Sequence, residues 1–191
     1  SAHGVPKSIE DAARARPLTI FDATCPLVTK VHREIIKMHE SGLPVVIIGH
    51  KGHPEVEGTI GQIPSGITVV ESVDDVATLP AGRSELACVT QTTISADDAA
   101  DVTAALKARF PNLVVPKKSD ICYATQSRQD AVKKLARRVD LVLVIGSASS
   151  SNSNRLKEVA ERSGTRAYLI EDASYLNVDW LAGISSVGIT A

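Results

Sequence analysis

Apolar residues along this chain follow two alternating patterns, one typical of buried strands and one typical of amphipathic helices. Continuous apolar runs at 43–48 and 141–145 predict strands that are covered on both faces in a parallel sheet. Between residues 26 and 42 apolar side chains recur at helical spacing, and they do so again after Cys122. Because strands alternate with helices along the whole length, the pattern predicts an α/β fold.

The same rules predict the remaining elements. Further helices are expected at 7–16, after Pro54, at 96–109 and at 154–162, and further strands at 18–21, 68–70, 85–89, 167–170 and 187–189. Ser8 and Asp11 have the spacing of a capping box at the start of the first helix. Two prolines and two lysines at 111–119 indicate a connection between two lobes.

Two stretches of the chain resemble each other when they are aligned on their cysteines. Cys25 precedes Gly49 by 24 residues, and Cys122 precedes Gly146 by the same distance. Each stretch reads as cysteine, helix, buried strand, glycine, polar loop and helix, which predicts two similarly folded lobes. The alternative is that any two strand–helix–strand units align this well. The repeat places each cysteine at a strand-to-helix turn, where ligands of parallel sheets bind.

Composition and charge narrow the function classes. The 191 residues carry 21 Lys and Arg against 22 Asp and Glu, and only 3% are aromatic, which argues against a nucleic-acid partner. No apolar run approaches the roughly 20 residues that span a bilayer, so no membrane partner is expected. Three cysteines, an odd number, fit a reducing cytoplasm better than a set of disulfides.

Cys25 and Cys122 both precede predicted helices. The positive end of a helix favours a thiolate, so either residue is a candidate nucleophile, redox thiol or metal ligand. The alternative for a single cysteine is a small buried apolar side chain. That description fits Cys88, which lies within a predicted strand.

Three polar loops follow predicted strands. In the loop 49–58, at most one histidine and one glutamate are expected to act, and a metal site on His50 and His53 is a weaker alternative. The loops 90–93 and 149–153 combine hydroxyl and amide groups with the start of a helix, which predicts anion binding. Neither loop has the glycines and lysine of a P-loop, so nucleotide binding is not indicated.

Six strings of residues, in the same order, resemble the IspH (LytB) family of 4-hydroxy-3-methylbut-2-enyl diphosphate reductases. They are SAHGV at 1–5, FDATCPLVTKVH at 21–32, GHKGHPEVEGTIGQ at 49–62, TQTTIS at 90–95, DICYATQSRQ at 120–129 and SSNSNRL at 150–156. The strings are long and unusual, and they run through nearly the whole chain.

The resemblance implies an architecture of three similar α/β lobes around a central cavity. Residues 1–24 would be the tail of the first lobe, 25–116 the second and 117–191 the third, so the expected fold is two repeated parallel-sheet lobes with a remnant of another. It also implies a cytoplasmic enzyme of the non-mevalonate isoprenoid pathway with a [4Fe–4S] cluster. This enzyme removes the hydroxyl group of a small allylic diphosphate, and ferredoxin or flavodoxin supplies the electrons.

The resemblance also implies roles for nine residues of this sequence. Two would hold iron, two would deliver a proton to the substrate hydroxyl and five would contact the diphosphate. They are Cys25 and Cys122 for iron, Glu55 and Thr92 for the proton, and His3, His53, Ser150, Ser151 and Asn152 for the diphosphate. Thiolates suit iron, and hydroxyls, imidazoles and helix N-termini suit a diphosphate.

The chain departs from the family pattern in three places. The N-terminal stretch with another cluster cysteine and a histidine is missing, a C-terminal serine of the diphosphate site is missing, and Ser149 replaces a usual asparagine. We therefore expect a truncated reductase with an incomplete set of ligands. One alternative is a cluster-free, inactive fragment that binds a diphosphate. Another is a zinc hydrolase that uses His50, His53 and one cysteine.

Overall fold

The structure is a computed structural model of the chain and describes residues 2–80 and 85–191. It forms two compact units. Unit 1 comprises residues 1–92 and 96–121, and unit 2 comprises residues 93–95 and 122–191. Each unit contains a parallel sheet with helices, so the predicted α/β fold is confirmed. Among the described residues, no helix combines the length and the apolar character that crossing a bilayer demands.

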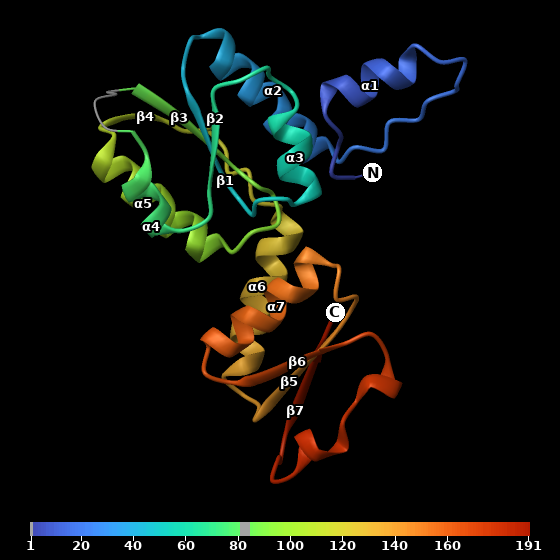
Figure 1. Ribbon diagram of the computed structural model, residues 1–191. Coiled ribbons are helices and arrows are strands. Elements are labelled where there is room, and N and C mark those ends of the chain that lie inside the picture. Colours follow the sequence, from blue (N-terminus) through green and yellow to red (C-terminus); the bar gives the residue numbers. More distant parts are fainter. Residues whose placement is uncertain (1, 81–84) are drawn as a thin grey trace. The chain divides into compact units, whose positions relative to one another are not determined.

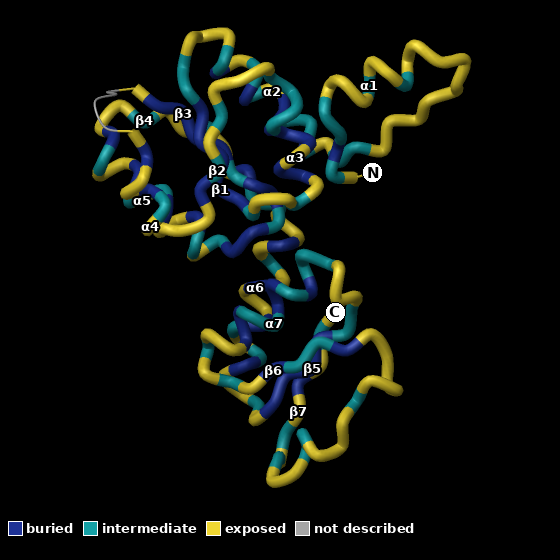
Figure 2. The backbone as a smooth tube through the Cα atoms, viewed as in Figure 1, coloured by how far each residue is buried: buried dark blue, intermediate teal, exposed yellow. Residues whose placement is uncertain are grey.

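In its described residues, unit 1 is built around a four-stranded parallel sheet with the order β2-β1-β3-β4 (Figure 1). The strands are β1 (Val45–Ile48), β2 (Ile67–Val70), β3 (Glu85–Thr90) and β4 (Asn112–Val114). Val45 pairs with Ile67 on one side and with Ala87 on the other. All four residues of β1 are buried (Figure 2), which explains why its sequence is a continuous apolar run.

Helices cover both faces of this sheet (Figure 1). On one face lie α2 (Pro26–Glu40) and α3 (Pro54–Ile60), and on the other lie α4 (Val73–Thr78) and α5 (Ala96–Arg109). Ile35 of α2 and Val56 of α3 pack in one buried cluster with Ile47 of β1. Pro26 and Pro54 each open a helix, because proline fits the first helical turn without losing a backbone hydrogen bond.

Unit 2, described throughout, has a parallel sheet with the order β6-β5-β7. Its elements are α6 (Tyr123–Ala136), β5 (Leu141–Ile145), α7 (Ser151–Arg162), β6 (Arg166–Ile170), the 3-10 turns η1 (Ala173–Tyr175) and η2 (Val178–Leu181), and β7 (Val187–Thr190). Val132 of α6 and Leu156 of α7 pack against Val144 on one face. Trp180 packs with the other face, where its ring stacks on Tyr168 with 3.8 Å between centroids.

The N-terminal segment of unit 1 differs from the prediction. Helix α1 (Lys7–Arg14) is capped by Pro6 without a side-chain hydrogen bond, so the predicted capping box is wrong. The strand expected at 18–21 is also wrong, because these residues pair with no strand in the described part of the chain. Phe21 is 88% exposed. A strand needs a partner for its backbone groups, and an apolar run alone does not supply one.

Two further boundaries are corrected. The stretch 111–119 is more than a connection, because it contains β4, whose Val114 pairs with Ala87 of β3. Helix α7 begins at Ser151 rather than at 154, so much of the predicted serine-rich loop is the first helical turn. The division into lobes 1–24, 25–116 and 117–191 stays a prediction.

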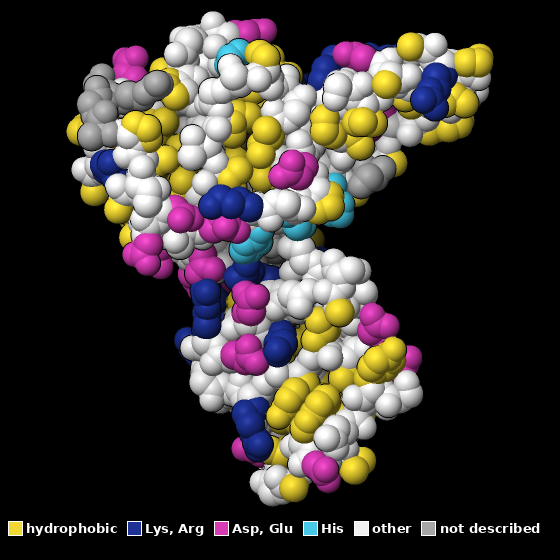
Figure 3. Space-filling view, viewed as in Figure 1, with side chains coloured by type: hydrophobic (Ala, Val, Ile, Leu, Met, Phe, Trp, Pro, Cys, Tyr) yellow, Lys and Arg dark blue, Asp and Glu magenta, His cyan; other side chains and the backbone are white. Residues whose placement is uncertain are grey.

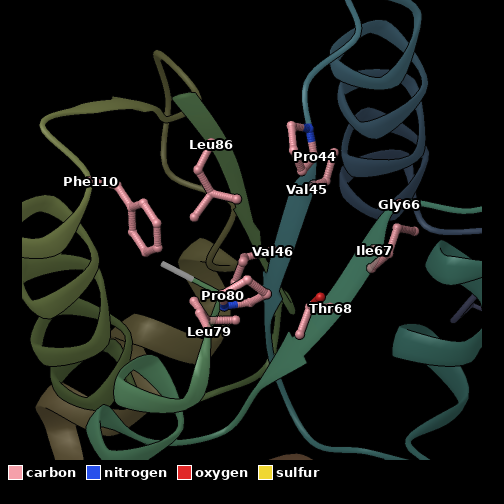
Figure 4. A pocket seen from close by; sticks show the side chains of 10 residues that line it. All are labelled: Pro44, Val45, Val46, Gly66, Ile67, Thr68, Leu79, Pro80, Leu86 and Phe110. Atoms are coloured by element: carbon pink, nitrogen blue, oxygen red, sulfur yellow. The ribbon is translucent and has the colours of Figure 1, made fainter. Parts of the chain in front are cut away.

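A small apolar pocket of about 160 Å³ opens at the amino ends of the strands in unit 1. Figure 4 shows Phe110 and Leu86 facing Leu79 and Pro80 across it. Thr68 is the one lining residue with a polar side chain, so this pocket has few side-chain donors for a diphosphate. Three candidate residues of unit 1 lie instead beyond the carboxyl ends of these strands, because His53 and Glu55 follow β1 and Thr92 follows β3.

Candidate functional site

Glu55 and Thr92 meet beyond the carboxyl end of the sheet in unit 1. Glu55 lies in the first turn of α3, which follows β1, and Thr92 follows the neighbouring strand β3. The Thr92 backbone N–H donates to Glu55 Oε1 at 2.6 Å, and the Thr92 hydroxyl donates to Glu55 Oε2 at 2.9 Å. Adjacent parallel strands end at one edge of the sheet, which brings these distant positions together.

The Glu55 carboxyl group is shielded from water, since the residue is only 2% exposed. Burial raises the pKa of Glu55, and the two hydrogen bonds from Thr92 offset only part of that effect. A carboxyl group with a raised pKa keeps its proton closer to neutral pH, as a general acid must. This pair is therefore suited to donating a proton.

His53 is the N-cap residue of α3. Its Nδ1 accepts a hydrogen bond from the Glu55 backbone N–H at 3.1 Å, so in the neutral ring Nε2 carries the proton. Burial lowers the pKa of His53, and the nearby His3 and His50 lower it further. His53 is therefore a neutral imidazole that can donate through Nε2, as binding of a phosphate oxygen requires.

His3 lies beside His53, with the two rings edge to face and their centroids 5.3 Å apart. The turn that carries His3 is tied to α2 by the Cys25 backbone N–H, which donates to Ala2 O at 3.0 Å. Gly4 has a φ of +71°, and a Cβ there would lie 2.6 Å from Cε1 of the buried His32. Only glycine fits this close approach, so local backbone geometry helps to position His3.

Sequence reasoning named Gln91 only as part of the anion-binding loop predicted at 90–93 and missed its structural role. Its side chain is fully buried, and its Oε1 accepts a hydrogen bond from the His50 backbone N–H at 3.0 Å. A Cβ on Gly49 would lie 2.9 Å from Gln91 Oε1. Gln91 thus holds the loop that leads to His53. The available signal was its place in the string TQTTIS, between Thr90 and Thr92.

Cys25 and Cys122 are the N-cap residues of α2 and α6. Both are partly exposed, and neither forms a disulfide. Burial opposes ionisation of Cys122, but hydrogen bonds from the backbone N–H groups of Thr125 and Ala124, the Thr125 hydroxyl and the nearby Arg128 together lower the pKa of the thiol. By contrast, burial raises the pKa of Cys88 to about 12, as expected for an apolar core position.

The described residues contain no group of three or more His, Cys, Asp or Glu side chains that could hold a metal ion. The trio of His50, His53 and one cysteine considered for zinc is therefore not brought together there. Cys25 and Cys122 could each act as a thiolate ligand, because each is partly exposed and lies at the start of a helix.

Ser150, Ser151 and Asn152 lie at the start of α7 in unit 2. The Ser150 hydroxyl caps the helix by accepting from the Ser153 backbone N–H at 3.3 Å. The Ser151 hydroxyl lies 3.3 Å from that of Thr93. The Asn152 Oδ1 atom is buried without a hydrogen-bond partner in the structure. An amide can turn over and present its NH₂ group there, which would supply a donor to an anion.

Unit 1 therefore groups Glu55 with Thr92 and His53 with His3, and unit 2 groups the three residues of α7. The catalytic, binding and metal roles of these residues stay predictions. The comparisons with known proteins bear on the family. The family model described as "LytB protein" matches residues 1–191.

The chain belongs to the LytB family.

Members of the LytB family from several bacteria resemble this chain throughout its length. A 4-hydroxy-3-methylbut-2-enyl diphosphate reductase of Polaromonas sp. is 61% identical and is covered over 58% of its own length. A protein of the same name from Bordetella pertussis is 62% identical and is covered over 59%. In both comparisons the whole chain is matched. The chain thus spans about three fifths of the length of these relatives.

Solved structures extend the likeness of this LytB chain to the fold. The E-1-hydroxy-2-methyl-but-2-enyl-4-diphosphate reductase of Plasmodium falciparum has a TM-score of 0.95 at 37% identity. The match covers the whole chain and 60% of that protein. A second solved structure, that of an (E)-4-hydroxy-3-methyl-but-2-enyl diphosphate reductase described as the terminal enzyme of the non-mevalonate pathway, has a TM-score of 0.63 at 36% identity and is covered over 68% of its length. Fold and sequence therefore agree on the LytB family.

Proposed function

We propose that this chain is the proton-delivering and diphosphate-binding portion of a 4-hydroxy-3-methylbut-2-enyl diphosphate reductase. The observation that carries the proposal is the buried Glu55–Thr92 pair, a carboxyl group with a raised pKa beside a hydroxyl group. The LytB relatives that match the whole chain carry this enzyme name. Because the chain spans about three fifths of their length, the activity is proposed for a chain of the relatives' full length.

The reaction breaks the allylic C–O bond of the substrate with two electrons and two protons. In the proposed mechanism Glu55 gives one proton to the departing oxygen, which leaves as water, and Thr92 relays that proton. The second proton adds to carbon and yields isopentenyl or dimethylallyl diphosphate. The buried position of Glu55 supports this role, because an acid held away from water keeps its proton until the hydroxyl arrives.

Neutral donors are the proposed ligands of the diphosphate. In unit 1, His53 would donate through Nε2, since its Nδ1 already accepts a hydrogen bond, and His3 would be the second histidine. In unit 2, the residues at the start of α7 would donate hydroxyl and amide hydrogens; they are Ser150, Ser151 and Asn152. A helix N-terminus attracts anions through its free N–H groups and its dipole.

Cys25 and Cys122 are the proposed thiolate ligands of a [4Fe–4S] cluster. The lowered pKa of Cys122 and the partial exposure of both cysteines support this assignment. When bound, such a cluster would pass electrons from an external donor to the substrate and would offer an iron to the substrate oxygen. A ferredoxin or flavodoxin is the proposed electron donor, and the cytoplasm is the proposed compartment, because unpaired cysteines persist in reducing surroundings.

The proposal is tested by an assay of a chain extended to the length of its relatives. With a chemical reductant it should form isopentenyl and dimethylallyl diphosphate. Glu55→Gln should lower turnover about 10²- to 10⁴-fold while binding of the substrate is retained. The matched control is Glu57→Gln, an exposed position on the same helix. Absence of both products would refute the function, and undiminished turnover in Glu55→Gln would refute the proton role.

Iron content separates the reductase from a cluster-free fragment that only binds a diphosphate. After anaerobic reconstitution, the extended chain should hold about four irons and absorb visible light. Cys122→Ser should lose most of that iron. A full iron complement in the variant would show that Cys122 is not a ligand. A colourless extended chain that still binds inorganic pyrophosphate would favour the cluster-free alternative.

A further inference from the structure

Asp120 is a buried carboxylate that the proposed mechanism does not use. The residue is only 4% exposed, and both of its oxygens are engaged within unit 1. Oδ1 accepts a hydrogen bond from Lys30 Nζ at 2.6 Å, and Oδ2 accepts one from the Thr90 backbone N–H at 3.0 Å. Asp120 precedes Cys122 by two residues, a span of about 7 Å of extended chain.

Lys30 joins helix α2 to the segment before Cys122. Besides its bond to Asp120, Lys30 Nζ donates to the Lys118 backbone oxygen at 3.0 Å and lies 3.2 Å from Glu34 Oε2. Burial alone would lower the pKa of Lys30, but the contacts with Asp120 and Glu34 raise it above its usual value. The lysine therefore remains a cation, and one side chain holds two points of the segment 118–120.

Asp120 accepts the hydrogen bond that the Thr90 backbone N–H would otherwise give to a neighbouring strand. Strand β3 pairs with β4 only from Glu85 to Ala87, because β4 ends at Val114. The neighbouring Gln91 N–H donates to Ile48 O of β1, so the Thr90 N–H points to the side where β4 has ended. Without Asp120 this backbone donor would lose its acceptor. The carboxylate thus fastens the segment 118–120 to the sheet as well as to α2.

We propose that Lys30 and Asp120 are positioning residues that fix the peptide leading into Cys122 to the helix that begins after Cys25. That these contacts matter for iron binding rests on the proposed function. That they hold the segment 118–120 to α2 does not. Neither residue touches the substrate or the iron in this account. They act through the segment 118–120 of unit 1, whose chain continues into the proposed iron ligand Cys122.

The fixing is tested by amide hydrogen exchange in the metal-free chain. Lys30→Met should speed exchange at Thr90 and across 118–122 by at least about tenfold, because the buried Asp120 carboxylate loses its cation. Asp120→Asn should do the same, because Lys30 loses its ion pair and its hold on the segment. Lys30→Arg should restore protection, since it keeps the cation. Lys37→Met, an exposed position on the same helix, is the control and should change neither region. Protected amides in β1 of unit 1 and in β5 of unit 2 would report that both units of each variant are folded.

Unchanged exchange in Lys30→Met would overturn the proposal. Because the Lys30 side chain is partly exposed, Lys30→Met should still fold, and it alone tests the proposal if Asp120→Asn does not fold. A second arm measures iron loss to a chelator in the reconstituted, extended chain. Loss should be about tenfold faster in Lys30→Met and normal in Lys30→Arg. If Lys30→Met exchanged its amides faster but kept its iron as well as the wild type does, the proposal that Lys30 positions the iron ligand would be overturned. Lys30 would then only stabilise the local structure. If the reconstituted, extended wild-type chain held no iron, the proposed iron–sulfur cluster would be refuted. Amide exchange would still test whether Lys30 and Asp120 hold the segment 118–120.

Discussion

Glu55 illustrates a conflict between chemistry and stability at a single residue. Burying a carboxylate is costly, and here two hydrogen bonds from Thr92 offset only part of the cost, so the pKa rises from its ordinary value of 4.5. The folded protein therefore binds this proton more tightly than the unfolded chain does. The resulting stabilisation is present at low pH and is lost as the pH rises through the raised pKa.

Glu55→Gln should consequently unfold at the same or a higher temperature than the wild type at pH 7–8. The amide keeps both contacts with Thr92, because its oxygen can accept from the backbone N–H and its NH₂ can donate to the hydroxyl. The advantage should shrink as the pH falls through 4.5 and below, where the carboxyl group becomes protonated in the unfolded chain as well. Thermal melts at several pH values check this, with Glu57→Gln as the control. A clear loss of stability at pH 8 would contradict it.

His53 has the opposite dependence on pH. Burial and the neighbouring histidines lower its pKa below 6.5, so the folded protein binds this proton less tightly than the unfolded chain. That contribution to stability is present above pH 6.5 and is lost as the pH falls through the window below it. His53→Asn keeps an N-cap acceptor for the Glu55 N–H but does not titrate.

Melting temperatures of His53→Asn should therefore fall less between pH 7.5 and pH 5 than those of the wild type. Some dependence should remain, because burial also lowers the pKa of His32. Ser72→Asn provides the control: it places the same residue at the N-cap of α4 without removing a histidine. The same loss of stability on acidification in His53→Asn and in the wild type would contradict the prediction.

At the scale of elements, the candidate residues gather at the starts of helices. Four helices have a candidate residue as the N-cap: Cys25 for α2, His53 for α3, Cys122 for α6 and Ser150 for α7. The free N–H groups at these positions favour thiolates and anions. The same backbone geometry thus serves both proposed kinds of ligand, iron and diphosphate.

Ser150→Ala separates the capping role from the binding role. Loss of the hydroxyl should cost about 0.5–2 kcal/mol of stability, because the Ser153 N–H loses its acceptor. The matched variant Ser72→Ala removes the cap of α4 and should cost a similar amount. Calorimetric titration with inorganic pyrophosphate should show weaker binding for Ser150→Ala alone. Equal affinities in the two variants would indicate that Ser150 acts only as a cap.

At the scale of the molecule, one exposed apolar segment stands out. In Figure 3 hydrophobic side chains lie along the N-terminal segment of unit 1. Its exposed apolar residues are Ile9, Leu18, Ile20 and Phe21, with 48–88% of their surface accessible. Large apolar side chains gathered on one exposed segment promote association between molecules. Helix α1 buries no residue, so this segment has little packing of its own.

Phe21→Ser should therefore reduce concentration-dependent self-association of the 191-residue chain and leave its melting temperature unchanged. Sedimentation velocity over a range of concentrations measures this effect, and added sulfate should strengthen association of the wild type. Val178→Ser is the control, because Val178 is 71% exposed but lies in unit 2. A wild-type chain that is monomeric at every concentration would contradict the prediction.

Local sequence patterns were sufficient to predict most helices and strands. They failed where the formation of a strand depends on a neighbouring strand with which it can pair. The run at 43–48 became β1, and the helix expected at 96–109 became α5 with the same bounds. The run at 18–21 is also largely apolar, as 43–48 is, but it forms no strand. Residues 112–114, which have a proline on either side nearby, do form one. The difference lies in β3, whose edge accepts residues 112–114. An edge partner is a property of the fold and leaves no trace in a short window of sequence.

The sequence by itself determined the alternation of strands and helices, the helix starts at Cys25 and His53, and the strings shared with the LytB family. These are short-range properties, set by side-chain periodicity, proline geometry and capping. Only the tertiary structure decided that Thr92 binds Glu55, that Gln91 holds the loop before His53, and that Asp120 joins Lys30 to Thr90. Each of these contacts joins residues at least 30 positions apart. The side-by-side pairing of β1 with β3 brings the residues that follow these strands to one edge of the sheet, and the packing of α2 against the sheet brings Lys30 to Asp120.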